Sequence, residues 1–196
     1  MAVQTFPDLA PAAQRLAELV LNVPDDLLGE PTPCEEYRLG DLLDHVGGFA
    51  LAFTAAAKKD SGMLTEPPRP GDASQLEAGW RTRIARDLSG MADAWQAPAA
   101  WSGMTQVGGV DLPGEICGIV ALDELVIHGW DVARASRQPF DCDGASLEAL
   151  MSFVGPDTEM GQMARTNGIF GPIVEVPEGS SQLDRVIGLT GRQPAW

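Results

Sequence analysis

The chain is poor in histidine, cysteine and basic residues, and the shortages of the last two each argue against a class of function. Its 196 residues include 2 histidines, 3 cysteines and 13 lysines and arginines, against 28 acidic residues, so that the net charge is −15. Nucleic-acid phosphates and anionic membranes attract basic patches, and we therefore expect neither as a partner. The odd number of cysteines, with no CxxC pair, does not suggest a disulfide framework, and each cysteine is predicted to be a structural thiol.

Long hydrophobic runs are also missing. The longest lie near residues 49–57 and 116–127, and neither reaches the roughly 20 residues that are needed to span a bilayer. The N-terminus lacks a basic segment followed by an apolar one, so no secretory signal is expected and the predicted location is the cytoplasm. Hydrophobic residues make up 44% of the chain, which is typical of a globular protein. We expect a monomer or a homodimer.

The apolar residues that are present recur at helical spacing in four long segments. We predict long helices over residues 8–22, 39–58, 73–95 and 113–136. The glycine-rich segment 101–115 between the last two is predicted to be an irregular connection or a short hairpin. Four long amphipathic helices predict an all-α protein, with a four-helix bundle in residues 1–140.

The last part of the chain, residues 141–196, is predicted to be a C-terminal extension that packs on the bundle within a single domain. Short helices are expected over residues 143–153 and 182–189, with a possible extended piece at residues 173–176. Arg165 and Asn167, which lie between these helices, are weak candidates for contacting an anionic substrate.

One histidine lies in the segment DELVIHGWD, residues 123–131, four residues after a glutamate. Residues at positions i and i+4 lie on the same face of a helix, so Glu124 and His128 can point at a common atom. They would form half of a divalent-metal site, and His45 in LLDHV can complete it, leaving coordination positions open. A metal would also offset the cost of burying an unpaired carboxylate in so apolar a helix.

Neighbouring residues suit supporting roles, although the spacing alone leaves the site open. Asp41, four residues before His45, and Asp131, three after His128, are placed to orient the imidazoles, and Trp130 is the best candidate for lining a pocket. The same spacing is also common in ordinary helix-surface pairs. The HExxH and Glu-x-x-His patterns of zincins and di-iron bundles are absent, and so is a GxSxG elbow, although a Ser–His–Asp or Cys–His pair stays possible.

Four segments together resemble a known family: TPCEEYRLGDLLDHVGG, ALDELVIHGWDVARAS, GIFGPIVEVPEG and DRVIGLTGRQPAW. They are similar to the DinB-like, mycothiol-dependent maleylpyruvate isomerase N-terminal superfamily, and more narrowly to its single-domain, metal-binding branch. The resemblance implies a four-helix bundle that holds a divalent metal, usually zinc, through His45, Glu124 and His128. Tyr37 stands where the family pattern usually has tryptophan, a difference expected to affect packing. At 196 residues, the chain is not expected to contain the separate C-terminal domain of the isomerase.

The resemblance also implies a function. We expect Zn²⁺ as the cofactor, with Ni²⁺ or another divalent ion as alternatives, and mycothiol as a cosubstrate. A metal-activated thiol would attack an electrophilic small molecule, in S-transfer or isomerisation. The alternatives are a non-catalytic metal- or thiol-binding or stress-related module, and a metal-dependent hydrolase. A fourth protein ligand would favour a structural metal site. Two cysteines are candidates for it, but Cys34 is expected to be a packed residue and Cys117 to lie too far from Glu124 along the helix to share the ion.

Overall fold

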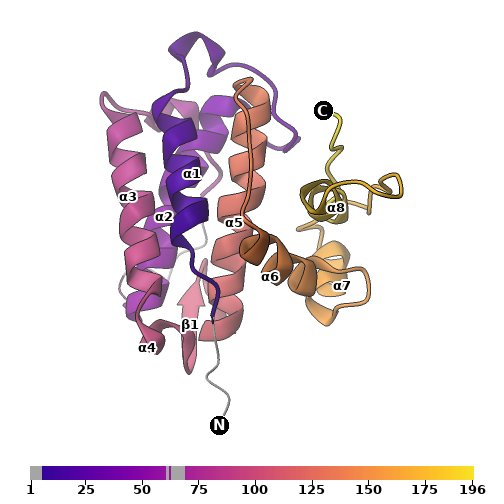
Figure 1. The fold of residues 1–196 in the computed structure, drawn as a ribbon. Helices are drawn as coiled ribbons and strands as arrows, with labels where there is room; N and C mark the ends of the chain where they lie inside the picture. Colours follow the sequence, from indigo (N-terminus) through magenta and orange to yellow (C-terminus); the bar gives the residue numbers. More distant parts are fainter. Residues whose placement is uncertain (1–5, 61, 63–68) are drawn as a thin grey trace. The chain divides into compact units, whose positions relative to one another are not determined.

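The computed structural model describes residues 6–60, 62 and 69–196, and the first part of the chain contains a bundle of four helices (Figure 1). These helices are α1 (Ala10–Leu21), α2 (Leu39–Lys58), α3 (Trp80–Trp95) and α5 (Gly114–Ala135). Helices α1 and α2 each pack against both α3 and α5, so the four surround a common core. The predicted all-α four-helix bundle is confirmed.

The core of the bundle is built from the apolar face of each helix. Leu16 of α1, Leu43 of α2, Leu88 of α3 and Leu125 of α5 are all fully buried. Burial of one such side chain contributes about 1.5–3 kcal/mol. Along each helix, buried apolar residues recur every three or four positions. This helical periodicity of the sequence was enough to predict the bundle.

Helix α3 begins later than predicted, and the reason is local. The sequence predicts one helix over residues 73–95, but residues 73–75 form a separate 3₁₀ turn, η2 (Ala73–Gln75), whose N-terminus is capped by Asp72. Gly79 then adopts a left-handed backbone with φ of 82°, which is incompatible with a continuing α-helix and costs glycine little. The helix therefore starts at Trp80.

The glycine-rich segment forms a hairpin, the second of the two predicted alternatives. After the short helix α4 (Pro98–Trp101), strands β1 (Met104–Val107) and β2 (Val110–Pro113) pair antiparallel with Val107 opposite Val110. The two residues between them, Gly108 and Gly109, have φ values of 58° and 78°, as a tight hairpin turn of the primed type requires. The hairpin leads directly into α5.

Residues 141–196 form a second compact unit with its own helices. They are α6 (Gly144–Val154), α7 (Glu159–Thr166) and α8 (Gln182–Leu189), of which α7 was not predicted. The possible extended piece at residues 173–176 forms no strand in this described part of the chain. The guanidinium of Arg165 donates to the backbone oxygens of Val154, Gly155 and Leu189. Arg165, which the sequence suggested as a contact for an anionic substrate, therefore links segments within this unit.

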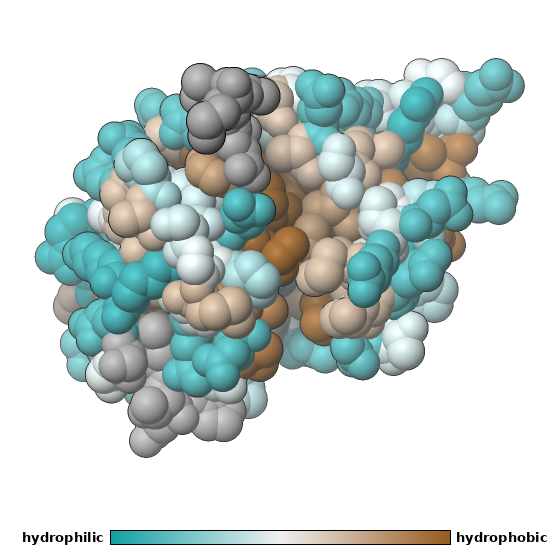
Figure 2. Space-filling model, turned by 90° about the horizontal axis from the view of Figure 1, so that it is seen from below, coloured by the Kyte–Doolittle hydropathy of each residue, from teal (hydrophilic) through white to brown (hydrophobic). Residues whose placement is uncertain are grey.

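Hydrophilic residues cover much of the face drawn in Figure 2. No helix among the described residues combines the length and the apolar character that a membrane crossing requires.

The close packing of α4 on α5 yields a stability prediction. A Cβ atom added at Gly118 would lie 2.3 Å from the Trp101 ring, whereas one added at Gly48, on α2, would meet nothing within 4 Å. We expect Gly118→Ala to lower the free energy of unfolding by about 1–3 kcal/mol through overpacking. The matched control Gly48→Ala should raise it by about 0.5–1 kcal/mol, because alanine favours helix. Urea denaturation of both variants measures the difference, and equal stabilities would contradict the packing.

Candidate metal centre

Two imidazoles converge on a single carboxylate oxygen inside the bundle. The Nε2 atoms of His45 and His128 both lie 3.3 Å from Oε2 of Glu124. One ligand atom from each of the three residues can be chosen so that all lie within 4.8 Å of one another. The structure therefore brings together the three residues that the sequence predicted as metal ligands.

Packing of α2 against α5 is what joins residues so distant in sequence. His45 lies on α2, while Glu124 and His128 lie one turn apart on α5. The side chains are partly accessible, with relative exposures of 20% for His45, 26% for Glu124 and 11% for His128. The cluster thus has a route to solvent on the side of Glu124 and His45.

The electrostatics of the cluster follow from its two carboxylates. Burial by itself would lower the pKa of His128, but hydrogen bonds to Asp131 and Glu124 outweigh it and raise that pKa to about 9. Burial opposes ionisation of Glu124, yet its hydrogen bonds with His128 and His45 hold its pKa well below the usual range. A carboxylate beside a protonated imidazole is accordingly the stable state of the metal-free cluster at neutral pH.

Asp131 lies where the sequence predicted a partner for an imidazole. Its side chain is fully buried, and Oδ2 lies 3.0 Å from Nδ1 of His128. This contact leaves Nε2 of the ring directed at Glu124. A carboxylate on one imidazole nitrogen fixes the ring orientation and increases the basicity of the other nitrogen, as is usual next to metal-binding histidines.

Asp41 has a different role from the one predicted. We expected it to orient His45, but its Oδ1 accepts from the backbone N–H of Ala73 at 2.8 Å, and its Oδ2 from that of Arg38 at 3.4 Å. Asp41 occupies the third position of α2, where a carboxylate reaches back to the free N–H groups of the helix end. The residue therefore caps α2 and anchors the η2 turn, and across the described contacts it does not bond His45.

Two aromatic residues that were not assigned to the site border it. Phe49, one turn after His45 on α2, lies with its ring centroid 6.3 Å from that of His128 and 5.6 Å from that of His45. Tyr37 stacks on His45 at 5.2 Å. The predicted pocket residue Trp130 is buried, with Arg134 over its ring. The i+4 spacing of Phe49 from His45 was the available signal in the sequence.

The cysteines do not complete the coordination of a metal at Glu124. The sulfur of Cys34 lies within 4.8 Å of ligand atoms of His128 and Asp131, so it is close to the site, but it does not group with His45 and Glu124. Cys117 is fully buried, and burial raises the pKa of its thiol to about 12. The part of the chain that the structure describes therefore offers three ligands to one ion at Glu124.

The three residues fit a divalent metal in both chemistry and spacing. Two imidazole nitrogens and a carboxylate are ligands that zinc accepts, and tetrahedral ligands at about 2.0–2.1 Å from zinc stand about 3.3 Å from one another. The two separations of 3.3 Å between nitrogen and Oε2 match this value. They are longer than the roughly 2.9 Å of a typical N–H···O hydrogen bond.

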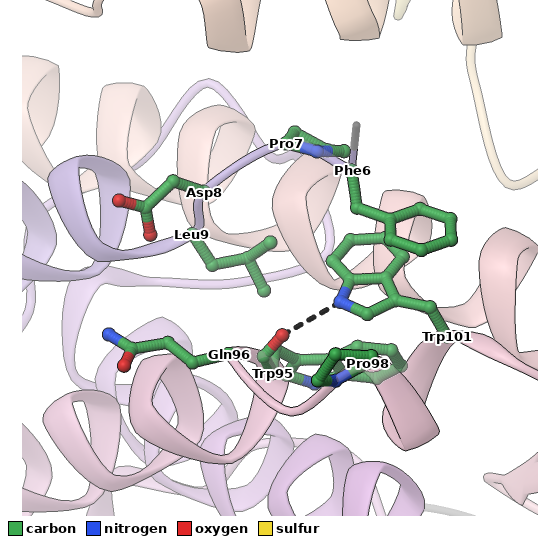
Figure 3. A pocket seen from close by; sticks show the side chains of 8 residues that line it. All are labelled: Phe6, Pro7, Asp8, Leu9, Trp95, Gln96, Pro98 and Trp101. Carbon is green, nitrogen blue, oxygen red and sulfur yellow. Dashed lines mark hydrogen bonds between the residues drawn. The ribbon is translucent and has the colours of Figure 1, made fainter. Parts of the chain in front are cut away.

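A cavity of about 280 Å³ lies elsewhere in the bundle unit, between the segment before α1 and the end of α3 (Figure 3). The indole N–H of Trp101 donates to the backbone oxygen of Trp95 across it, and the Phe6 ring stacks on Trp101 at 4.7 Å. The residues that line it are Phe6, Pro7, Asp8, Leu9, Trp95, Gln96, Pro98 and Trp101. None of these lining residues belongs to the cluster at Glu124, so this cavity is separate from the candidate metal centre.

The bundle and its cluster define a helical protein with a candidate metal centre of two histidines and a glutamate. The chain belongs to the mycothiol maleylpyruvate isomerase N-terminal domain family, whose sequence pattern matches residues 9–133. Its relatives include uncharacterized proteins from the CDC 1551 / Oshkosh and H37Rv strains of Mycobacterium tuberculosis. Each is 29% identical over 150 residues, which cover 74% of this chain and 76% of the relative. No solved structure matches the chain.

Metal binding at this centre should release a proton. His128 is protonated below about pH 9 in the metal-free protein, and a metal ligand must be neutral imidazole. At pH 7 we expect release of about one proton per ion, and an apparent affinity for Zn²⁺ that rises about tenfold per pH unit between about pH 6.5 and pH 8. Calorimetric titrations in two buffers of different ionisation enthalpy measure the release. Identical heats in both buffers would contradict the assignment of His128.

Proposed function

We propose that the protein binds one divalent metal ion, most favourably Zn²⁺, through His45, Glu124 and His128. The observation that carries this proposal is the convergence of both Nε2 atoms on one Glu124 oxygen at 3.3 Å. Ni²⁺ or another divalent ion suits the same nitrogen and oxygen ligands.

The residues around these ligands would prepare the site for catalysis. A divalent ion with three protein ligands and an open position supplies Lewis acidity, which favours the ionised form of a thiol or water that binds there. Asp131 holds the His128 ring with its Nε2 inward, and Phe49 covers the apolar side of both imidazoles. These contacts orient the ligands and exclude water from one side of the cluster.

A low-molecular-weight thiol is the proposed cosubstrate. The description of the matched family names mycothiol and maleylpyruvate isomerase, which supports a thiol-dependent reaction of an electrophilic small molecule, either S-transfer or isomerisation. The accessible fractions of Glu124 and His45 leave an approach for such a thiol.

A non-catalytic metal- or thiol-binding module is the main alternative, and a hydrolase that uses metal-bound water shares the same ligands. The lack of a fourth described ligand beside His45, Glu124 and His128 favours an enzyme, because structural zinc sites have closed coordination. Dependence of turnover on the thiol separates S-transfer and isomerisation from hydrolysis.

The ligand assignment is tested by His45→Ala and Glu124→Gln. Each removes one of three ligands, so the affinity for Zn²⁺ should fall by more than about 100-fold, beyond the usual effect of changing a residue that only supports a ligand. Zinc content after dialysis and competition with a fluorescent chelator provide the measurement. The matched control is Glu115→Gln, an exposed glutamate on the same helix α5, which should bind zinc as the wild type does. Full zinc content in both ligand variants would rule out this centre.

The proposed activity has a separate test. The zinc-loaded protein is mixed with mycothiol and a panel of electrophiles, and consumption of the thiol is followed together with that of the electrophile. We expect turnover that requires both zinc and mycothiol and that His45→Ala abolishes. Zinc binding without any binding or turnover of the thiol would favour the non-catalytic alternative. Turnover of esters or amides without thiol would favour the hydrolase.

A further inference from the structure

The two histidines of the candidate centre are held in different ways. His128 has a carboxylate on each ring nitrogen, Asp131 on Nδ1 and Glu124 on Nε2. His45 bonds only Glu124, through Nε2, and among the described residues its Nδ1 has no hydrogen-bond partner. Apart from that bond, the described contacts that orient the ring are with its faces and edges.

Aromatic rings provide those contacts. The ring of Tyr37 stacks on His45 at 5.2 Å with an angle of 26° between the planes. Phe49 and His128 meet His45 edge-on, with interplanar angles of 73° and 84°. Stacked and edge-to-face pairs at these separations are favourable, and together they restrict rotation of the imidazole about its bond to Cβ. Phe49 also contacts His128, so Tyr37 is the neighbour whose described aromatic contact is with His45 alone.

The loop that carries Tyr37 is held by contacts of the Thr32 hydroxyl and by its own backbone hydrogen bonds. The Thr32 hydroxyl lies 2.8 Å from the carbonyl oxygen of Cys34 and 2.9 Å from that of Tyr37, and the N–H of Tyr37 donates to the oxygen of Cys34. A β-bridge between Pro31 and Arg38 closes the loop immediately before α2. Tyr37 therefore stands on a small, braced platform rather than on a free turn.

We infer that Tyr37 is a positioning residue that holds the His45 ring in its metal-binding orientation through stacking, in place of the carboxylate that His128 has. The aromatic face performs this role, while the phenol hydroxyl bonds the backbone of Gly71. The inference rests on the proposed metal centre, which it deepens. It assigns a role to the segment TPCEEY, in which Thr32 braces the loop and Tyr37 reaches the site.

The test compares Tyr37→Leu with Tyr37→Phe and Tyr37→Trp. Affinity for Zn²⁺, measured by chelator competition, should fall about tenfold in Tyr37→Leu. This is the lower end of the loss in affinity that is usual when a residue that orients a metal-binding histidine is changed. Tyr37→Phe and Tyr37→Trp keep the aromatic face and should stay within about twofold of the wild type. Thermal unfolding of the metal-free variants checks that the fold is kept.

A second readout does not depend on metal. Relaxation measurements on ¹³C-labelled imidazoles of the metal-free protein should show increased motion of the His45 ring in Tyr37→Leu, with His128 unchanged. A general loosening of the bundle would increase the motion of both rings and would overturn the inference. Equal loss of zinc affinity in Tyr37→Phe and Tyr37→Leu would overturn it as well, because the hydroxyl would then carry the effect.

The outcomes also separate this inference from the proposed function. If the wild type binds no zinc, the proposed metal centre is wrong, and the ring motion of His45 alone decides whether Tyr37 restrains it. If the wild type binds zinc and Tyr37→Leu binds it equally well, the centre stands and the role of Tyr37 is refuted.

Discussion

The contact on which the candidate centre depends is the one between the Glu124 carboxylate and the imidazoles of His45 and His128. A carboxylate in so apolar a helix is costly unless positive charge or a metal compensates it. Here the compensation reaches across the bundle from α2 and along α5, so the site exists only when these two helices are packed. The metal-free protein keeps the cluster by protonating His128, whose pKa is raised to about 9.

The features that the sequence predicted are those with a local period. The four bundle helices follow from apolar residues at helical spacing, and the proximity of Glu124 and His128 follows from the i, i+4 rule alone. Their meeting with His45, 79 residues before Glu124, has no local signature. The scarcity of histidine made His45 the candidate to complete the site, and the resemblance to a family supported that choice, because no spacing rule connects residues on separate helices.

The errors had local causes as well. Asp41 stands four residues before His45, which suggested a contact between them, but its place in the first turn of α2 gives its carboxylate the backbone N–H groups of Arg38 and Ala73. Periodicity extended the third helix across Gly79, where the left-handed backbone ends any helix. Helix α7 escaped notice because its eight residues carry few apolar side chains, and such short helices owe their stability to tertiary packing more than to propensity. For Asp41 and Gly79, a position near a helix end decided the outcome.

The unequal support of the two histidines has a consequence for the chemistry of the centre. A ligand fixed by a buried carboxylate is both oriented and made more basic, whereas a ligand fixed by stacking is oriented without added negative charge. His128 and Asp131 therefore contribute the strongly donating side of the cluster, while His45, beside Tyr37, contributes a nitrogen with no carboxylate behind it among the described residues. Less charge donated to an ion leaves it a stronger Lewis acid. A metal bound at such a centre would therefore keep more Lewis acidity than one with a second buried carboxylate behind His45.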